Sequence, residues 1–215
     1  MKISRTYITP AAQRLLESSE GARQAYEEVR QSILRNTNKD NKFYFNDSMK
    51  KGNGVRPVKH ECYRILEEEY GWYREKPLNV LKHKYHKGGP IDVYKEYPQY
   101  EPVFKAGLEF ETGNVSSAHR SANKLRLGMK YDELDISFLM MPIEYMHKFL
   151  TDRVSNYEEI EPYMEVYDEV PMIFFGFEAD VYDKEFPFLP KGKDGMSDRS
   201  IRKWSDKDKK GPSKR

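Results

Sequence analysis

The chain has 215 residues, of which 38% are hydrophobic and 33% are charged, and its formal net charge is +2. This length and composition predict one globular domain with a hydrophobic core, or one domain with appendages, and an aromatic share of 13% excludes a mostly disordered chain. The longest apolar run, residues 136–143, is far too short to span a membrane, so no membrane association is expected.

The single cysteine, Cys62, excludes an intrachain disulfide and a cysteine-based zinc site. It lies in the apolar phase of a helical pattern, which favours a core position over a nucleophilic role. The first ten residues lack the apolar segment of a signal peptide. These features together predict a protein of the reducing cytoplasm.

The first part of the chain predicts helices. Thr9 and Pro10 have the residue types of a helix N-cap and a first helical position. Apolar residues at helical spacing up to Ile33 predict two helices that break near Gly21. Further predictions are a short strand at residues 43–45, a glycine-bearing basic turn at residues 50–57 and a helix at residues 59–70.

Residues 88–114 carry acidic side chains in a pattern suited to metal binding, namely Asp92, Glu109 and Glu111. Apolar and acidic residues alternate around Glu109, so a strand would direct its apolar residues to a core and both glutamates to the other face. A neighbouring strand could bring Asp92 beside Glu109. Two interpretations remain open here, a Mg²⁺ site and a solvated strand face.

The next segments predict a helix at residues 115–131 and a central buried strand at residues 136–141 that ends at Pro142. The helix would begin close to the glutamate pair, and a helix N-terminus favours anions. A short helix ending near residue 150, an acidic helix at residues 157–163 and a last strong strand at residues 172–177 follow. Interleaved helices and strands predict an α/β fold with helices on both faces of a central mixed sheet.

Two segments are strongly basic. Residues 82–87 include His83 and His86, but this segment is more typical of a solvated or phosphate-facing loop than of a metal site. Residues 191–215 hold ten Lys or Arg against four Asp. We therefore expect a single domain over residues 1–190 and a basic, partly disordered C-terminal arm that either meets a polyanion or aids solubility.

Five blocks of sequence resemble the BamHI family of type II restriction endonucleases, in the same order and with the same spacing. They are GWYREKPL (71–78), GGPIDVYKE (88–96), EFETGNVSSAHRSANKL (109–125), FLTDRVSN (149–156) and LPKGKDGMSDRSIRKW (189–204). The resemblance covers most of the chain and is weaker at residues 36–50 and 157–185. It implies the PD-(D/E)XK nuclease fold, in which a mixed sheet is flanked by helices.

The resemblance implies four catalytic carboxylates, Glu75, Asp92, Glu109 and Glu111. Asp92 and Glu109 would be the main ligands of Mg²⁺, with two ions in each active site, while Glu75 and the carbonyl of Phe110 would complete the coordination. Most nucleases of this superfamily have lysine where this chain has Glu111. Because a glutamate can accept a proton from water or orient it, Glu111 is the candidate general base.

The resemblance also implies a set of DNA-contacting residues: Lys59, Asn114, Ser116, Arg120, Asp152, Arg153 and Asp194. Arg120 would read guanine through paired donors, and Asp152 would accept a hydrogen bond from cytosine. From the residues alone, Arg120 could equally pair with an acidic neighbour, and Asp152 could cap the segment that follows it.

The implied activity is Mg²⁺-dependent cleavage of double-stranded DNA at GGATCC, after the first G, which leaves 5′-phosphate and 3′-hydroxyl ends. A palindromic target implies a two-fold symmetric homodimer, and a cognate DNA methyltransferase is expected in the same host. The helix at residues 117–131 and the acidic helix resemble the dimer-forming elements. Their charges could pair between chains or within one, and the residues concerned are Lys124, Arg126 and Lys130 with Glu158, Glu159 and Glu161.

Two alternatives belong to other classes. A DNA-binding protein of the same fold could have altered specificity or have lost cleavage, although all four carboxylates are present. A glycosidase also needs two carboxylates at suitable separation. The basic arm and the basic segment at residues 82–87 fit a phosphate substrate better than a sugar.

Overall fold

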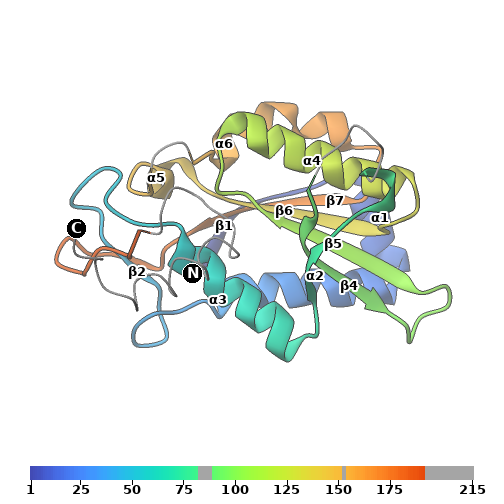
Figure 1. The fold of residues 1–215 in the computed structure, drawn as a ribbon, viewed down its shortest axis with the longest axis horizontal. Coiled ribbons are helices and arrows are strands. Elements are labelled where there is room, and N and C mark those ends of the chain that lie inside the picture. Colours follow the sequence, from blue (N-terminus) through green and yellow to red (C-terminus); the bar gives the residue numbers. More distant parts are fainter. Residues whose placement is uncertain (82–88, 152–153, 192–215) are drawn as a thin grey trace, which may run out of the picture.

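The computed structural model in Figure 1 describes residues 1–81, 89–151 and 154–191. At its centre is a six-stranded sheet with the strand order β1-β7-β6-β5-β4-β3. The strands are β1 (Lys2–Ile8), β3 (Tyr73–Lys76), β4 (Ile91–Tyr97), β5 (Phe104–Phe110), β6 (Ile136–Pro142) and β7 (Met172–Glu178). β6 pairs in parallel with β5 and β7, and the other pairs are antiparallel. The predicted mixed sheet is therefore confirmed.

Helices cover both faces of this sheet, as predicted for an α/β fold. α2 (Glu20–Leu34) and α3 (Arg56–Arg64) lie on one face, and α4 (Val115–Lys130) with α6 (Tyr157–Ile160) lies on the other (Figure 1). The remaining elements are α1 (Pro10–Ser18), α5 (Glu144–His147) and a separate parallel pair of β2 (Tyr44–Phe45) and β8 (Val181–Tyr182). Across the described ranges, no helix is both long and apolar enough to cross a membrane.

β6 is buried along its whole length because it lies between β5 and β7. Phe138 and Met140 pack with α2 and α3, whereas Leu139 and Met141 pack with α4. Successive side chains of a strand point to opposite faces, so a strand with helices on both sides must be apolar on both. This confirms the predicted central strand, which ends at Pro142.

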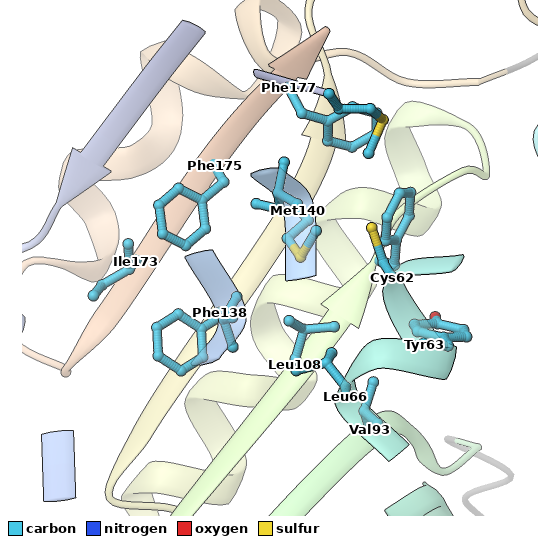
Figure 2. Close-up of a cluster of buried hydrophobic side chains, with 14 of the residues drawn as sticks. Cys62, Tyr63, Leu66, Val93, Leu108, Phe138, Met140, Ile173, Phe175 and Phe177 are labelled. Carbon is cyan, nitrogen blue, oxygen red and sulfur yellow. The ribbon is translucent and has the colours of Figure 1, made fainter. Parts of the chain in front are cut away.

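Figure 2 shows the core on the α2 and α3 side of the sheet. Side chains of β6 and β7, including Phe175 and Phe177, belong to the same buried cluster as Cys62 and Tyr63 of α3. Cys62 is fully buried, and burial raises the pKa of its thiol to about 12. A protonated, inaccessible thiol is a poor nucleophile, so the predicted core position of Cys62 is confirmed.

Local capping explains the first two helices. The Thr9 side chain caps α1, as predicted, and its hydroxyl also accepts a hydrogen bond from the amide of Met172 at 3.1 Å. The break between the helices lies at Ser19, because its side chain caps the N-terminus of α2. The break predicted near Gly21 is therefore two residues too late. Gly21 itself lies in the first turn of α2, against the ring of Phe104.

Proline sets the boundaries of two other helices. α3 begins at Arg56, earlier than the predicted start at residue 59, because Pro57 occupies its first turn, and it continues into a π-helical segment at Ile65–Glu69. The acidic helix predicted at residues 157–163 is α6 followed by a 3₁₀ helix, Glu161–Tyr167, that has a proline in its first turn.

β1 is absent from the sequence-based expectations. It forms an edge of the sheet, where it pairs with β7, and most of its side chains are exposed or half-buried. Because an edge strand with polar side chains lacks the alternating apolar signal, periodicity does not identify it.

The described C-terminal end is better packed than its composition suggests. Proline, glycine, lysine and serine are frequent from Phe188 onward, a composition typical of a poorly ordered segment. Instead Leu189 is buried, its amide donates to the side-chain oxygen of Asn53 at 3.0 Å, and its carbonyl accepts from the amide of Gly54 at 2.9 Å. A polar and glycine-rich sequence does not reveal these contacts, because the partner segment lies about 135 residues away in the chain.

Candidate active site

The register of three strands places three acidic residues in one row across the sheet. Glu75 lies between two residues of β3 that pair with β4, so its position in the register is opposite that of Asp92. On the other side of β4, the pairing of Val93 with Leu108 puts Asp92 opposite Glu109. The neighbouring strands expected from the sequence do bring Asp92 beside Glu109.

Asp92 is held by three donors that converge on its Oδ2. Lys59 Nζ lies at 3.2 Å, the Tyr63 hydroxyl at 2.6 Å and the Phe110 amide at 3.1 Å. Burial acts to raise the pKa of Asp92, but these three donors together hold that pKa below its usual value. Asp92 is therefore an ionised carboxylate in a fixed orientation.

Glu109 projects from β5 toward α4. Lys124 Nζ of α4 lies 2.5 Å from Glu109 Oε1, and Ser121 Oγ donates to Glu109 Oε2 at 3.3 Å. Burial and the charge of Asp92 raise the pKa of Glu109 to about 8, although Lys124 opposes this shift. The site is thus short of positive charge at this carboxylate.

Glu111 is joined to Glu109 by the same serine. Ser121 Oγ also donates to Glu111 Oε2 at 2.9 Å, and the Gly113 amide donates to Glu111 Oε1 at 2.5 Å. Burial raises the pKa of Glu111, and these two hydrogen bonds partly offset that effect. A Cβ at Gly113 would lie 2.8 Å from Glu111 Oε1, so a larger residue there would displace the carboxylate.

The predicted division of the strand into a core face and a carboxylate face is correct, but the carboxylate face is not open to solvent. Glu109 and Glu111 are only 5% and 6% exposed because α4 covers them. The interpretation of these residues as a solvated strand face is therefore wrong. A buried pair of carboxylates is costly unless cations or hydrogen-bond donors compensate for it.

Three side chains at this site were missed as site residues, namely Tyr63, Ser121 and Lys124. Tyr63 and Ser121 had no distinguishing signal in the sequence. Lys124 did have one, because it lies on the apolar face of α4 between Ala122 and Leu125, where a charged residue needs a partner.

Glu75 stands apart from the other carboxylates. It is exposed, and its φ of 55° puts it in the left-handed region, which is rare for a residue other than glycine. Within the described ranges, no group of three or more His, Cys, Asp or Glu side chains is arranged to hold a metal ion. Ammonium groups lie where cations would be expected, since Lys59 contacts Asp92 and Lys124 contacts Glu109.

The donor set still fits a hard divalent cation. Asp92, Glu109 and Glu111 supply only oxygen, which Mg²⁺ prefers. Within the described ranges, the buried Glu109 Oε1 makes no hydrogen bond of ordinary geometry, and a cation, the Lys124 ammonium, lies 2.5 Å from it. The N–H and C=O of one strand residue point to the same side, and the Phe110 amide points to Asp92. The Phe110 carbonyl is therefore directed toward β4, the strand that carries Asp92.

Three of the seven predicted DNA-contacting residues, Asn114, Ser116 and Arg120, lie at the N-terminal end of α4, which adjoins this site. Asn114 caps α4 through its side chain, which accepts from the Ser117 amide at 2.9 Å. Ser116 and Arg120 are exposed on the first two turns of the helix. The structure gives Arg120 no acidic partner within the described ranges, so the ion pair considered from the sequence is not formed there.

The other predicted contacts have mixed outcomes. Lys59 lies in the site, where its ammonium contacts Asp92 and its side chain is 27% exposed. Asp152, Arg153 and Asp194 lie outside the described residues, as do His83 and His86. Ser155, which follows Asp152 and Arg153 in the chain, lies close to the start of α4, since its amide donates to the Gly113 carbonyl at 2.6 Å.

Charged residues that were predicted to pair between the two helices have other partners within this chain. Lys124 binds Glu109, and Arg126 pairs with Glu169. Glu158 accepts from the Glu144 amide, and Glu159 forms a capping box with Asn156 at the start of α6. α4 and α6 nevertheless pack against each other within the chain.

Comparison with known proteins identifies the family. The model of the family described as restriction endonuclease BamHI matches residues 1–196. The chain belongs to the BamHI family of restriction endonucleases. The type II restriction enzyme BamHI of Bacillus amyloliquefaciens is 50% identical over 211 residues, which cover 96% of this chain and 98% of that enzyme. The type II restriction enzyme OkrAI of Oceanobacter kriegii is 36% identical over 166 residues, which cover 74% of this chain and 81% of that enzyme.

A solved structure confirms the fold of this BamHI-family chain. The crystal structure of restriction endonuclease BglII complexed with a DNA 16-mer has a TM-score of 0.61 to it, with 14% sequence identity over 88% of this chain and 86% of that one. The chain is accordingly a type II restriction endonuclease, a site-specific DNA-cleaving enzyme, as the resemblance implied.

Proposed function

We propose that this restriction endonuclease cleaves double-stranded DNA at GGATCC, after the first G, in a reaction that depends on Mg²⁺. The observation that supports this best is the convergence of Asp92, Glu109 and Glu111 beside the N-terminus of α4, in a chain 50% identical to BamHI. In this arrangement, the carboxylates that would act on the phosphate lie a few residues from side chains suited to reading base pairs.

Asp92, Glu109, Glu75 and the Phe110 carbonyl are the proposed ligands for two Mg²⁺ ions in each active site. When bound, Mg²⁺ would lower the pKa of a coordinated water and neutralise charge that develops on the phosphate. Asp92 is fixed for this role by its three donors. Glu75 would complete the set only if β3 presents it to Asp92, which it faces in the register.

Glu111 is the proposed general base. Its raised pKa makes it a better proton acceptor than an ordinary glutamate, and Ser121 with the Gly113 amide fixes its orientation. Glu111 would take the proton of the attacking water. The bond between phosphorus and the 3′ oxygen would break, with the 3′ oxygen as the leaving group. α4 covers this carboxylate and excludes bulk water from it.

We assign sequence readout to Asn114, Ser116 and Arg120 at the start of α4, and to Asp152, Arg153 and Asp194 by resemblance. We further propose one domain over residues 1–190 with a basic arm beyond it, and a homodimer, because a palindrome has two equivalent strands. A cognate methyltransferase would protect the host, in whose cytoplasm we place the enzyme.

Cleavage of a plasmid with a single GGATCC sequence tests the proposal directly. We expect one linear product in Mg²⁺ and none in EDTA, with sequenced ends that begin after the first G. A plasmid in which that sequence is changed at one base pair is the matched control. A linear product from both plasmids would rule out the proposed target, and no cleavage of either would favour the alternative, a DNA-binding protein that has lost cleavage.

Replacement of Arg120 by alanine should reduce discrimination at one base pair by about 1–3 kcal/mol, since a bidentate arginine contact with guanine has this worth. Binding competition in Ca²⁺ between GGATCC and its single-substitution variants measures this. An equal loss of affinity for all sequences would instead make Arg120 a phosphate contact. Lys130→Ala, at an exposed position of the same helix, serves as the control.

A further inference from the structure

Lys124 is a buried cation inside the site that none of the steps above uses. Its side chain is 10% exposed and that of Glu109 is 7% exposed, and the two charges lie 2.5 Å apart. The side chain leaves α4 on its apolar face, where Ala122 and Leu125 contribute to the core. A lysine is rarely buried without a compensating partner, so this position has a specific requirement for positive charge.

The ammonium group also reaches a second strand. Lys124 Nζ donates to the carbonyl of Pro90 at 2.8 Å, directly before β4 and two residues from Asp92. Lys124 thereby links α4 to the strands that carry Asp92 and Glu109.

Lys124 is one of the cations that balance the negative charge of the carboxylates in the site. With every group ionised, the three carboxylates of Asp92, Glu109 and Glu111 have two cations in contact with them among the described residues, Lys59 and Lys124. Each lysine contacts a different carboxylate, and they come from helices on opposite faces of the sheet. In a metal-free enzyme, these ammonium groups offset the negative charge of the carboxylate oxygens, as a bound divalent ion would.

We propose that Lys124 is a positioning residue that occupies the cation position at Glu109 in the metal-free enzyme and competes there with a divalent ion. Lys124 keeps the carboxylates assembled before metal and DNA arrive, and its ammonium must withdraw from Glu109 Oε1 before that oxygen can coordinate a metal. Its bond to the Pro90 carbonyl gives the ammonium a second partner that is independent of Glu109. The inference rests on the proposed metal site.

Thermal unfolding with and without Ca²⁺ tests this on the full chain, because at a given concentration a ligand of the folded state raises the unfolding temperature more when it binds more tightly. We expect Lys124→Met to unfold at a lower temperature than the wild type in EDTA, but to bind Ca²⁺ at least about tenfold more tightly, since one competing unit charge is gone. Calorimetric titration of the same proteins with Ca²⁺ gives the affinity independently.

The matched control is Arg126→Met, which removes a cation from the same helix that pairs with Glu169. It should leave Ca²⁺ affinity unchanged. A purely structural role for Lys124 would lower stability without tightening Ca²⁺ binding, and that outcome overturns the proposal. If Lys124→Met folds only when Ca²⁺ is present, the ion has replaced the ammonium and the proposal stands, whereas failure to fold in either condition overturns it.

The two proposals fail in distinguishable ways. If the wild type responds to Ca²⁺ and Lys124→Met responds no more strongly, only the role of Lys124 is refuted. If neither protein responds to Ca²⁺ or Mg²⁺, with or without DNA, the metal site itself is refuted.

Discussion

Replacement of Glu111 by lysine should abolish cleavage while metal-free binding to DNA is kept or strengthened. The side chain that would accept the proton of the attacking water is lost, and general-base catalysis contributes about 10²–10⁴-fold in rate. At the same time a positive charge replaces a negative one beside the position of the phosphate. The cluster of three carboxylates and two lysines would change from a net negative to a net positive charge.

Two measurements check the Glu111→Lys prediction. Single-turnover cleavage in Mg²⁺ gives the rate, and equilibrium binding to a GGATCC duplex in EDTA gives the affinity. Glu17→Lys has the same change of charge at an exposed position of α1 and should alter neither. Weaker specific binding by Glu111→Lys than by the wild type would count against the role assigned to Glu111.

Replacement of Glu28 by alanine should cause the largest loss of stability outside the site, about 3–5 kcal/mol, because it leaves a buried charge uncompensated. Glu28 is buried in α2 and accepts hydrogen bonds from Lys95 at 2.9 Å, Trp72 at 2.8 Å and Tyr97 at 2.8 Å. Without it the ammonium of Lys95 and two aromatic donors would have no acceptor at this place. The network joins α2 to β4, the strand that carries Asp92.

Urea unfolding measures the free energy of unfolding of the Glu28→Ala variant. Glu27→Ala is the matched control, since Glu27 forms an exposed pair with Arg30 on the same helix and should cost less than about 1 kcal/mol. A loss for Glu28→Ala as small as that of the control would show that the network adds little. If cleavage activity falls with stability, the link from α2 to β4 also positions Asp92.

The sequence predicts those elements that are covered on both faces or that begin at a local capping residue. β6 is buried at every residue and mostly apolar because both of its faces are covered, and Thr9 with Pro10 marks the start of α1 through local hydrogen bonding alone. β1 escapes detection because its stability comes from pairing with β7, at the opposite end of the described chain. The burial of Leu189 likewise depends on Asn53, which is distant in sequence.

For the site, the residue types along the chain predicted that Glu109 and Glu111 share one face of a strand next to a helix N-terminus, and that Asp92 could join them from a neighbouring strand. This was possible because the spacing of Glu109 and Glu111 on one strand is a local property. Only the tertiary structure decided that α4 buries these carboxylates, that Ser121 bridges two of them, and that Lys124 lies against Glu109. The physical reason is that charge compensation in a buried site depends on contacts across the sheet and its helices, and a linear sequence does not encode those distances directly.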